Sequence, residues 1–166
     1  MNDENIIQYV PIGVIKTPFK KTDGMPIQSK FSEAEGTVIL PIKFYEATKG
    51  LEDFSHVFLI YHFHKAKESK QLVKPFLSNQ IMGLFSVRAP NRFNPIGFSV
   101  VEVLYIESRK NEIRIQVKGV DMLDQTPLLD IKPYFSEFDC FTNTKNGWYD
   151  KREIKQTTAD NRFSKQ

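Results

Sequence analysis

The sequence predicts an all-β, mostly antiparallel fold, a small β-barrel with short helices and proline-rich loops. Aromatic residues, which favour strands, make up 13% of the 166 residues, and 14 residues are phenylalanine. Five or more strand-like runs follow one another at short spacing. Long helical periodicity is missing before residue 147, which leaves a barrel or sandwich as the fitting architecture.

The first three expected strands come from runs of apolar residues at 9–15, 36–40 and 57–63. The third run is apolar on both faces, so we expect it at the centre of the sheet. Between the second and third runs, residues 44–49 can form one or two helical turns. Gly50 stands where a helix usually ends.

The clearest strand signal is residues 113–118, where apolar and polar side chains alternate strictly. This alternation places Ile113, Ile115 and Val117 on one buried face. A β-branched and aromatic run precedes it at residues 98–106, and the link at residues 107–111 is short and polar. We therefore predict an antiparallel hairpin.

Three connections, residues 17–28, 88–95 and 125–134, are rich in proline and are predicted to be loops. Proline fixes its own φ and restrains the residue before it, so these loops should be stiff. Stiff loops that carry polar side chains on a β scaffold are common places for binding sites.

The length favours one domain, which we predict as a β-barrel domain at residues 1–147 followed by a basic tail at residues 148–166. Residues 151–166 hold five basic and two acidic side chains, and so the whole net charge of +3. The stretch from Asp150 to Phe163 could be a helix with a thin apolar face. The tail is either a solvated chain end or a segment that follows RNA phosphates.

Several features indicate a cytoplasmic protein. The N-terminus, Met1–Asn5, is polar and acidic, unlike a signal peptide. We find no apolar run of the roughly 20 residues that a membrane span needs. The single cysteine, Cys140, cannot form an internal disulfide, which fits a reducing compartment.

Two segments, Arg88–Ser99 and Gly119–Tyr134, concentrate the polar chemistry. Arg88 and Arg92 bracket a proline, and an arginine fork suits a carboxylate or a phosphate. Asp130 lies between apolar neighbours, where a carboxylate needs a partner such as Lys132 or Arg88. These segments are the candidate binding site.

Together the two segments resemble the paired signature of the TrmO (YaeB/TsaA-like) family, and residues 12–19, 34–36 and 50–56 agree with it. The resemblance runs from about Ile12 to about Asp139. It implies a TsaA-like β-barrel that forms a homodimer and binds S-adenosyl-L-methionine near the subunit interface. The implied reaction is methylation of N6 of threonylcarbamoyladenosine beside the tRNA anticodon.

The resemblance also implies which residues contact the cofactor: Pro26, Ile27, Gln28, Phe63, His64, Arg88, Phe98, Asp121, Met122, Leu123 and Asp124. The acceptor nitrogen should need a proton acceptor, and we hypothesise that Asp130 or Asp124 plays this part. Arg92, Lys132 and Tyr134 are expected to position the RNA. A Rossmann site is not indicated, because no strand is followed by the Gly-x-Gly-x-x-Gly turn.

The chain departs from the family pattern at a few positions. It has Ile27 where arginine is usual, Phe93 where proline is usual, and Gln125 where glycine is usual. Residues 74–77 read Lys-Pro-Phe-Leu in place of a Pro-Pro-Arg motif. The loss of an arginine at position 27 bears on cofactor and RNA binding.

Two other functions fit parts of the sequence. His56, His62 and His64 could share one face of a strand and ligate zinc, although such histidines are more often structural and we expect no metal. A non-catalytic RNA-binding β-barrel module would use the many aromatic and basic residues. Its net charge would usually be more one-sided than 23 basic against 20 acidic residues.

Overall fold

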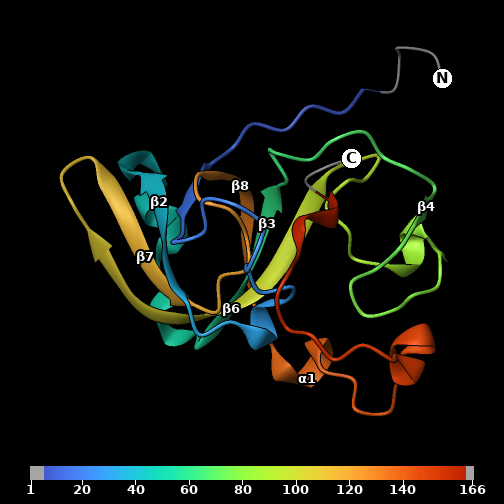
Figure 1. Ribbon diagram of the computed structural model, residues 1–166. Coiled ribbons are helices and arrows are strands. Elements are labelled where there is room, and N and C mark those ends of the chain that lie inside the picture. The colour runs from blue at the N-terminus through green and yellow to red at the C-terminus, as the bar shows by residue number, and fades with distance from the viewer. Residues whose placement is uncertain (1–5, 164–166) are drawn as a thin grey trace.

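The computed structural model describes residues 6–163, so the predictions for Met1–Asn5 and for the last three residues of the tail lie outside the described part. Six strands close into a barrel in the order β1-β2-β7-β6-β3-β8, and every neighbouring pair is antiparallel (Figure 1). The predicted all-β barrel is therefore confirmed. The strands are β1 (Gly13–Lys16), β2 (Glu35–Pro41), β3 (His56–His62), β6 (Ile96–Ser108), β7 (Glu112–Lys118) and β8 (Thr126–Pro133).

The remaining elements are short. A two-stranded sheet pairs β4 (Leu72–Val73) with β5 (Met82–Gly83), and α1 (Ser136–Asp139) is a single helical turn. Short 3₁₀ helices occupy residues 29–31, 42–48, 51–53, 84–86, 147–151 and 161–163. Within residues 6–163, no helix has the length and apolar character needed to cross a membrane.

The barrel interior is a mainly aliphatic core. Ile15, Val38, Leu59, Ile113 and Leu128 are fully buried, one from each of five strands. The period-2 prediction for β7 is confirmed, because Ile113, Ile115 and Val117 all belong to this core. Burying such side chains contributes roughly 1.5–3 kcal/mol each.

The other predicted strands differ from the structure mainly at their ends. The run predicted at residues 57–63 is β3, which lies between β6 and β8. The run predicted at residues 9–15 begins as a strand only at Gly13; residues 9–11 are exposed, and Ile12 is partly buried against the core. The helical turns before Gly50 form as 3₁₀ helix, and Gly50 takes a left-handed φ of 80°.

The prediction of a loop at residues 125–134 is wrong, because this segment is β8 and closes the barrel between β1 and β3. Its two prolines led to the prediction of a loop, and their positions explain why a strand forms nevertheless. Pro127 is the second residue of the strand and Pro133 is the last, so the missing N–H groups fall near the strand ends. Between them, a register shift opposite Ile60 and Tyr61 takes up one extra residue.

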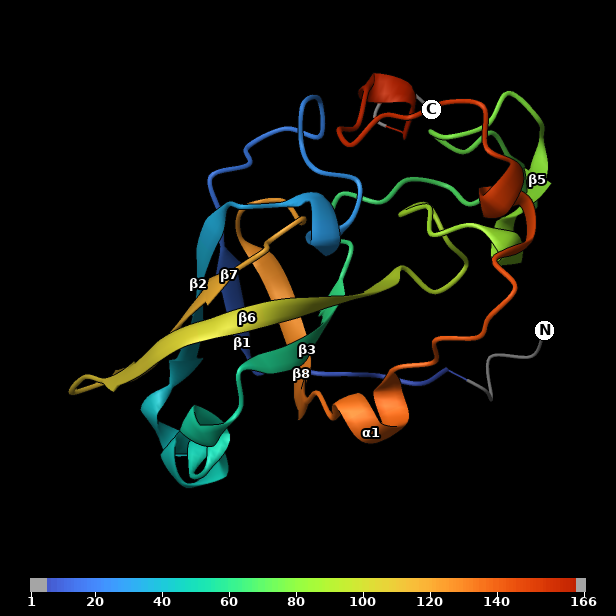
Figure 2. The ribbon, with the colours of Figure 1, turned by 90° about the horizontal axis from the view of Figure 1, so that it is seen from below.

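The tail does not form the helix considered for Asp150–Phe163. It folds back as irregular chain with two 3₁₀ turns, and Thr158 forms a β-bridge with Pro26. Arg162 Nη1 donates to the Pro75 carbonyl over 2.6 Å. Figures 1 and 2 show this segment beside the loops next to the barrel. The division at residue 147 remains our proposal, and the described part of the tail packs on those loops.

Candidate functional site

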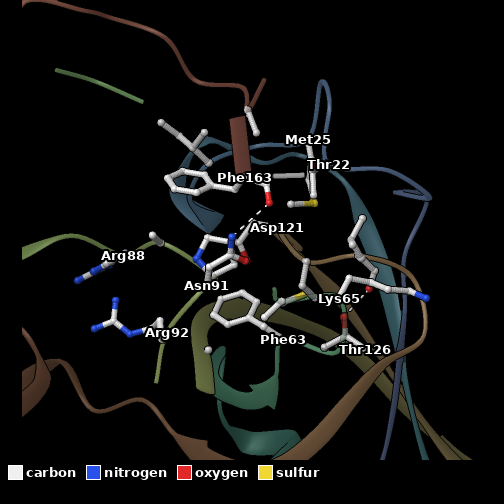
Figure 3. A pocket seen from close by; sticks show the side chains of 18 of the residues that line it. Thr22, Met25, Phe63, Lys65, Arg88, Asn91, Arg92, Asp121, Thr126 and Phe163 are labelled. Atoms are coloured by element: carbon white, nitrogen blue, oxygen red, sulfur yellow. Dashed lines mark hydrogen bonds between the residues drawn. The ribbon is translucent and has the colours of Figure 1, made fainter. Parts of the chain in front are cut away.

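A cavity of about 660 Å³ lies where the loops cover the barrel (Figure 3). Ten of the eleven residues expected to contact a cofactor line it, although they come from five separate stretches of the chain. They are Pro26, Ile27, Gln28, Phe63, His64, Arg88, Phe98, Asp121, Met122 and Leu123. The tail adds Ala159, Asp160 and Phe163 to the wall.

The cavity is electropositive. Its charged lining consists of two aspartates and six basic side chains: Lys20, Lys21, Lys65, Lys67, Arg88 and Arg92. Three of these side chains already form ion pairs with residues outside the lining: Asp160 with Arg162, Lys20 with Asp124, and Lys21 with Asp23. In Figure 3 Arg88 and Arg92 stand on one side and Lys65 on the other, with Asp121 between them in the view. This arrangement favours an anionic group, such as a carboxylate or a phosphate.

Arg88 is held at the cavity wall by two contacts. Its Nη1 donates to Gln28 Oε1 over 2.8 Å, and its guanidinium carbon lies 5.1 Å from the centre of the Phe98 ring. The guanidinium has five N–H donors, so these contacts orient the fork and leave donors for a ligand. Arg92 is tied to the backbone instead, because its Nη1 donates to the Val87 carbonyl over 2.8 Å.

Asp121 ends a buried chain of hydrogen bonds that sequence reasoning missed. Ser99 Oγ donates to Asp121 Oδ1 over 2.5 Å, and Tyr61 Oη lies 3.1 Å from Ser99 Oγ. Burial raises the pKa of Tyr61, so the phenol keeps its proton and can donate to Ser99. The only sequence signal was that Ser99 follows Gly97 and Phe98 in the family motif, in strand alternation with the buried positions.

Burial also raises the pKa of Asp121 to about 6, despite the opposing hydrogen bond from Ser99, backbone N–H donors and the nearby Arg88 charge. The desolvated carboxylate is thus a stronger base than an ordinary aspartate. At neutral pH it is mostly ionised and can accept a proton.

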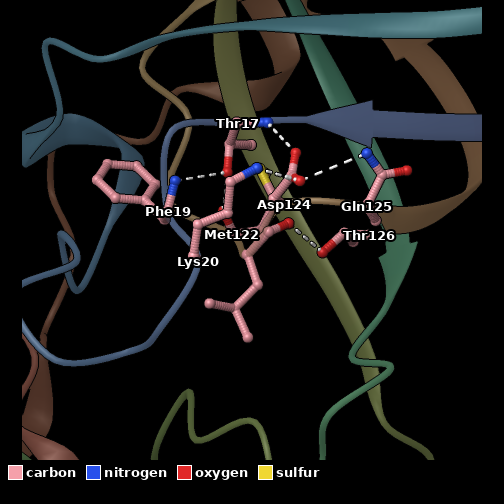
Figure 4. A network of polar contacts seen from close by, with 8 residues as sticks. Thr17, Phe19, Lys20, Met122, Asp124, Gln125 and Thr126 are labelled. Carbon is pink, nitrogen blue, oxygen red and sulfur yellow. Dashed lines mark hydrogen bonds and ion pairs between the residues drawn. The ribbon is translucent and has the colours of Figure 1, made fainter.

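Asp124 serves a different purpose, and it is not among the residues that line the cavity. Its Oδ1 accepts the Thr17 backbone N–H over 3.0 Å, and its Oδ2 forms an ion pair with Lys20 (Figure 4). The hydrogen bond from Lys20 contributes most to lowering the pKa of Asp124. These contacts fasten the loop after β1 to the turn before β8.

The next residue, Gln125, has a φ of 62° and is the only non-glycine residue within 6–163 with a positive φ. This is the position where the resembled family usually has glycine. A left-handed conformation costs an L-residue roughly 1 kcal/mol, which explains why glycine suits the turn.

Asp130, Lys132 and Tyr134 do not line the cavity. Asp130 Oδ2 lies 2.8 Å from Lys132 Nζ, so the expected partner of this carboxylate is Lys132, and 45% of the Asp130 side chain is exposed. Both residues pair with β3 positions that alternate with the buried Leu59, which puts them on the outer face of the barrel. The predicted catalytic and RNA-positioning residues of this chain are therefore divided between two surfaces.

The three histidines do not share one strand face. β3 ends at His62, and the chain then turns, with the Phe63 N–H donating to the Pro95 carbonyl over 2.7 Å. Burial first, and then the neighbouring Lys65, lowers the pKa of His64, which lines the cavity as a neutral imidazole. Among residues 6–163 no group of three or more His, Cys, Asp and Glu is placed to hold a metal ion.

Asn91, another residue that sequence reasoning missed, fixes the loop that carries both arginines. It is buried, its Oδ1 accepts the Lys67 N–H over 3.0 Å, and its Nδ2 donates to the Phe163 carbonyl over 3.3 Å. One side chain thus ties three segments together around the cavity. The only hint in the sequence was its place between the two arginines.

Known proteins resemble this chain in sequence and in fold. A protein from Pyrococcus abyssi named "Probable S-adenosyl-L-methionine-binding protein" is 47% identical over 161 residues, which are 95% of this chain and 85% of that protein. The Escherichia coli tRNA (adenine(37)-N6)-methyltransferase is 36% identical over 134 residues, covering 76% of this chain and 57% of the enzyme. The crystal structure of TrmO from P. aeruginosa superposes with a TM-score of 0.73 at 36% identity, covering 90% of this chain and 64% of that one.

The chain thus spans little more than half of the E. coli enzyme and just under two thirds of the solved structure. The model of the tRNA-methyltransferase O N-terminal domain matches residues 14–140, which include all of the barrel except Gly13, the first residue of β1. With the relatives and the shared fold, this match shows that the chain belongs to the tRNA-methyltransferase O N-terminal domain family.

Proposed function

We propose that the protein is an S-adenosyl-L-methionine-dependent tRNA methyltransferase that methylates N6 of threonylcarbamoyladenosine next to the anticodon. The observation that carries this proposal is the cavity, which gathers ten of the eleven expected cofactor residues from distant parts of the chain. The names of the P. abyssi and E. coli relatives support it. We infer from such a substrate that the protein acts in the cytoplasm.

The cavity residues fit the cofactor in their chemistry. When bound, S-adenosyl-L-methionine supplies a methyl group activated by a sulfonium. Arg88 offers an oriented fork for its carboxylate, and the rings of Phe63 and Phe98 suit its adenine. The protein's part is chiefly to orient the reactants, which can supply several orders of magnitude in rate.

The proton of the acceptor nitrogen needs a base, and we assign this role to Asp121. Its carboxylate lines the cavity, and burial brings its pKa to about 6, close to neutral pH. Asp124 is a weaker base because its ion pair with Lys20 and the Thr17 N–H stabilise the charged form. Asp130 lies outside the cavity of its own protomer, so it can act only where a second copy adjoins.

We propose that the homodimer forms through the outer face of β3, β6 and β8. There, Phe98, Ile60 and Asp130 form one row across the three strands. Phe98 is 51% exposed and also lines the cavity, so this row starts at the cavity mouth. Two strand spacings, about 10 Å, separate Phe98 from Asp130. A second copy packed on this face would bring Asp130, Lys132 and Tyr134 near the bound RNA.

Calorimetric titration with S-adenosyl-L-methionine tests the function. We expect micromolar binding, about −8 kcal/mol, that weakens at least tenfold in Arg88→Ala because the carboxylate loses its fork. Arg109→Ala is the matched control, since Arg109 lies in the β6–β7 hairpin and pairs only locally with Glu107. Light scattering on the same sample should give twice the 19.3 kDa protomer mass.

Failure to bind the cofactor, with the fold intact, would overturn the methyltransferase proposal. The non-catalytic RNA-binding module would then be the better description. Equal weakening by Arg88→Ala and Arg109→Ala would instead show that Arg88 has no special part in the site.

A further inference from the structure

A second cavity, of about 530 Å³, adjoins the first behind Arg88. The two cavities share seven lining residues, which form a common boundary between them: Ile27, Gln28, Phe76, Val87, Arg88, Ala89 and Phe163. The outer side of the second cavity comes from the tail, which contributes Trp148 and Tyr149. This part of the chain lies beyond residues 14–140, where the family model matches.

The second cavity is lined by flat rings. Phe31, Phe76, Trp148 and Tyr149 all face it, and Phe31 is 40% exposed. Trp148 Nε1 donates to the Ser86 carbonyl over 2.8 Å, which fixes the orientation of the indole. Aromatic rings that are already oriented make good stacking surfaces, because little side-chain entropy is lost on binding.

Tyr149 is held in a similar way. The Arg152 guanidinium carbon lies 4.0 Å from the centre of the Tyr149 ring, and Arg152 Nη1 donates to the Tyr149 carbonyl over 2.9 Å. In the tail, the orientation of Trp148 is thus fixed by a backbone carbonyl and that of Tyr149 by the Arg152 guanidinium.

The charge of this cavity has one sign. Lys30 and Arg88 are its only charged lining residues, and no Asp or Glu within residues 6–163 lines it. Aromatic faces combined with cations are the features that bind bases and phosphates of single-stranded nucleic acid. The cavity holds only three of the expected cofactor residues, Ile27, Gln28 and Arg88, and it lacks the Asp121 carboxylate.

We propose that the second cavity binds a nucleotide of the RNA strand adjacent to the one being methylated, with its base stacked on Trp148 or Tyr149 and its phosphate near Lys30 and Arg88. This inference rests on the proposed function. Arg88 lies in the wall between the two cavities, so neighbouring nucleotides of one strand can occupy both sides of it. The tail then serves to recognise RNA through aromatic stacking, in addition to its positive charge.

The chain has a single tryptophan, so its fluorescence reports on this cavity alone. We expect a tRNA anticodon stem-loop, and more weakly a single-stranded oligoadenylate, to quench the fluorescence of the wild-type protein, because stacked bases quench indole emission. S-Adenosyl-L-methionine alone should leave the fluorescence nearly unchanged. Quenching by the cofactor but not by RNA would overturn the proposal and assign the cavity to the cofactor.

Variants provide a second measurement. Trp148→Ala should weaken stem-loop binding about tenfold, and Trp148→Phe should retain most of the affinity because a ring remains for stacking. Phe141→Ala, at a position that is 76% exposed and outside both cavities, should bind as the wild type does. Cofactor affinity by calorimetry should stay the same in all three variants.

The two proposals fail in different ways. Loss of cofactor binding by the wild-type protein contradicts the methyltransferase function. Intact cofactor binding with no RNA-dependent quenching, or with stem-loop affinity unaffected by Trp148→Ala, contradicts only the nucleotide site.

Discussion

Inside the barrel, Ile15, Val38 and Leu59 pack without polar partners and are fully buried. The loop end, formed by residues 17–31, 63–95, 119–125 and 146–163, has a smaller apolar cluster and depends in addition on polar side chains fixed by hydrogen bonds, such as Asn91 and Asp124. Nearly all the regular sheet lies in the first region, and nearly all the cavity lining lies in the second. The difference indicates that the barrel provides the stability of the protein and the loop end provides its chemistry.

Of all the proposed substitutions, truncation of a core side chain inside the barrel should change the stability of the protein most. Leu59→Ala should lower the free energy of unfolding by about 2–5 kcal/mol, because a closed barrel cannot collapse around the cavity left behind. Urea unfolding measures the loss, and Leu72→Ala on the exposed face of β4 is the control. Cofactor affinity of the folded fraction should not change. A large change in that affinity would show that the barrel core also determines cofactor binding.

Asp121→Asn tests whether stability and function depend on different regions, because it should raise the free energy of unfolding and lower the turnover. Burial raises the folded-state pKa of Asp121 to about 6 from the ordinary 3.8. The protonated Asp121 therefore makes its full contribution to the free energy of unfolding below about pH 4, and this contribution is lost as the pH rises through about 6. Since Asp121 borders an open cavity, we expect Asp121→Asn to gain only about 1–2 kcal/mol at neutral pH.

The same variant should lose most of its turnover while cofactor affinity changes little. Urea unfolding at about pH 4 and about pH 8, with single-turnover methylation at saturating cofactor, checks both parts. Full turnover would contradict the assignment of Asp121 as proton acceptor. A loss of affinity as large as the loss of turnover would make Asp121 a cofactor contact only.

The smallest expected effect is at the left-handed turn before β8. Gln125→Gly should raise the free energy of unfolding by about 0.5–1 kcal/mol, because glycine adopts a φ of 62° without strain. Gln125→Ala retains the strain and serves as the matched control. Thermal unfolding of the two variants side by side measures the difference. Equal stability of both would mean that the turn is not strained.

The barrel was largely predictable from the sequence, because period-2 alternation directly reports which side of a strand is buried. It succeeded for β7, where Ile113, Ile115 and Val117 are buried as predicted. It failed for β8, because Pro127 and Pro133 indicated a loop and the bulge between them interrupts the alternation. A proline in the sequence marks a position without a backbone N–H donor. Whether a neighbouring strand requires a hydrogen bond at that position depends on the fold.

The site was predictable only as far as the family motifs extend. The motifs gave ten cavity residues, whereas Asp130 and Asp124, hypothesised as proton acceptors from the chemistry of the reaction, do not line the cavity. Tyr61 and Ser99 were missed because their importance lies in a contact between β3 and β6. Trp148 and Phe163 were missed because an irregular tail has no periodicity from which packing can be inferred.

Closure of the barrel has a further consequence for how the protein meets other chains. Each of the six strands has a neighbouring strand on both sides over at least part of its length, so most of the barrel backbone is already paired. The long strand β6 differs, because it pairs with β3 only over Ile96–Glu102 and with β7 only over Glu102–Ser108. Within residues 6–163, a strand of another molecule could therefore add to the barrel chiefly along the unpaired flanks of β6, and association elsewhere on the barrel proceeds through side chains.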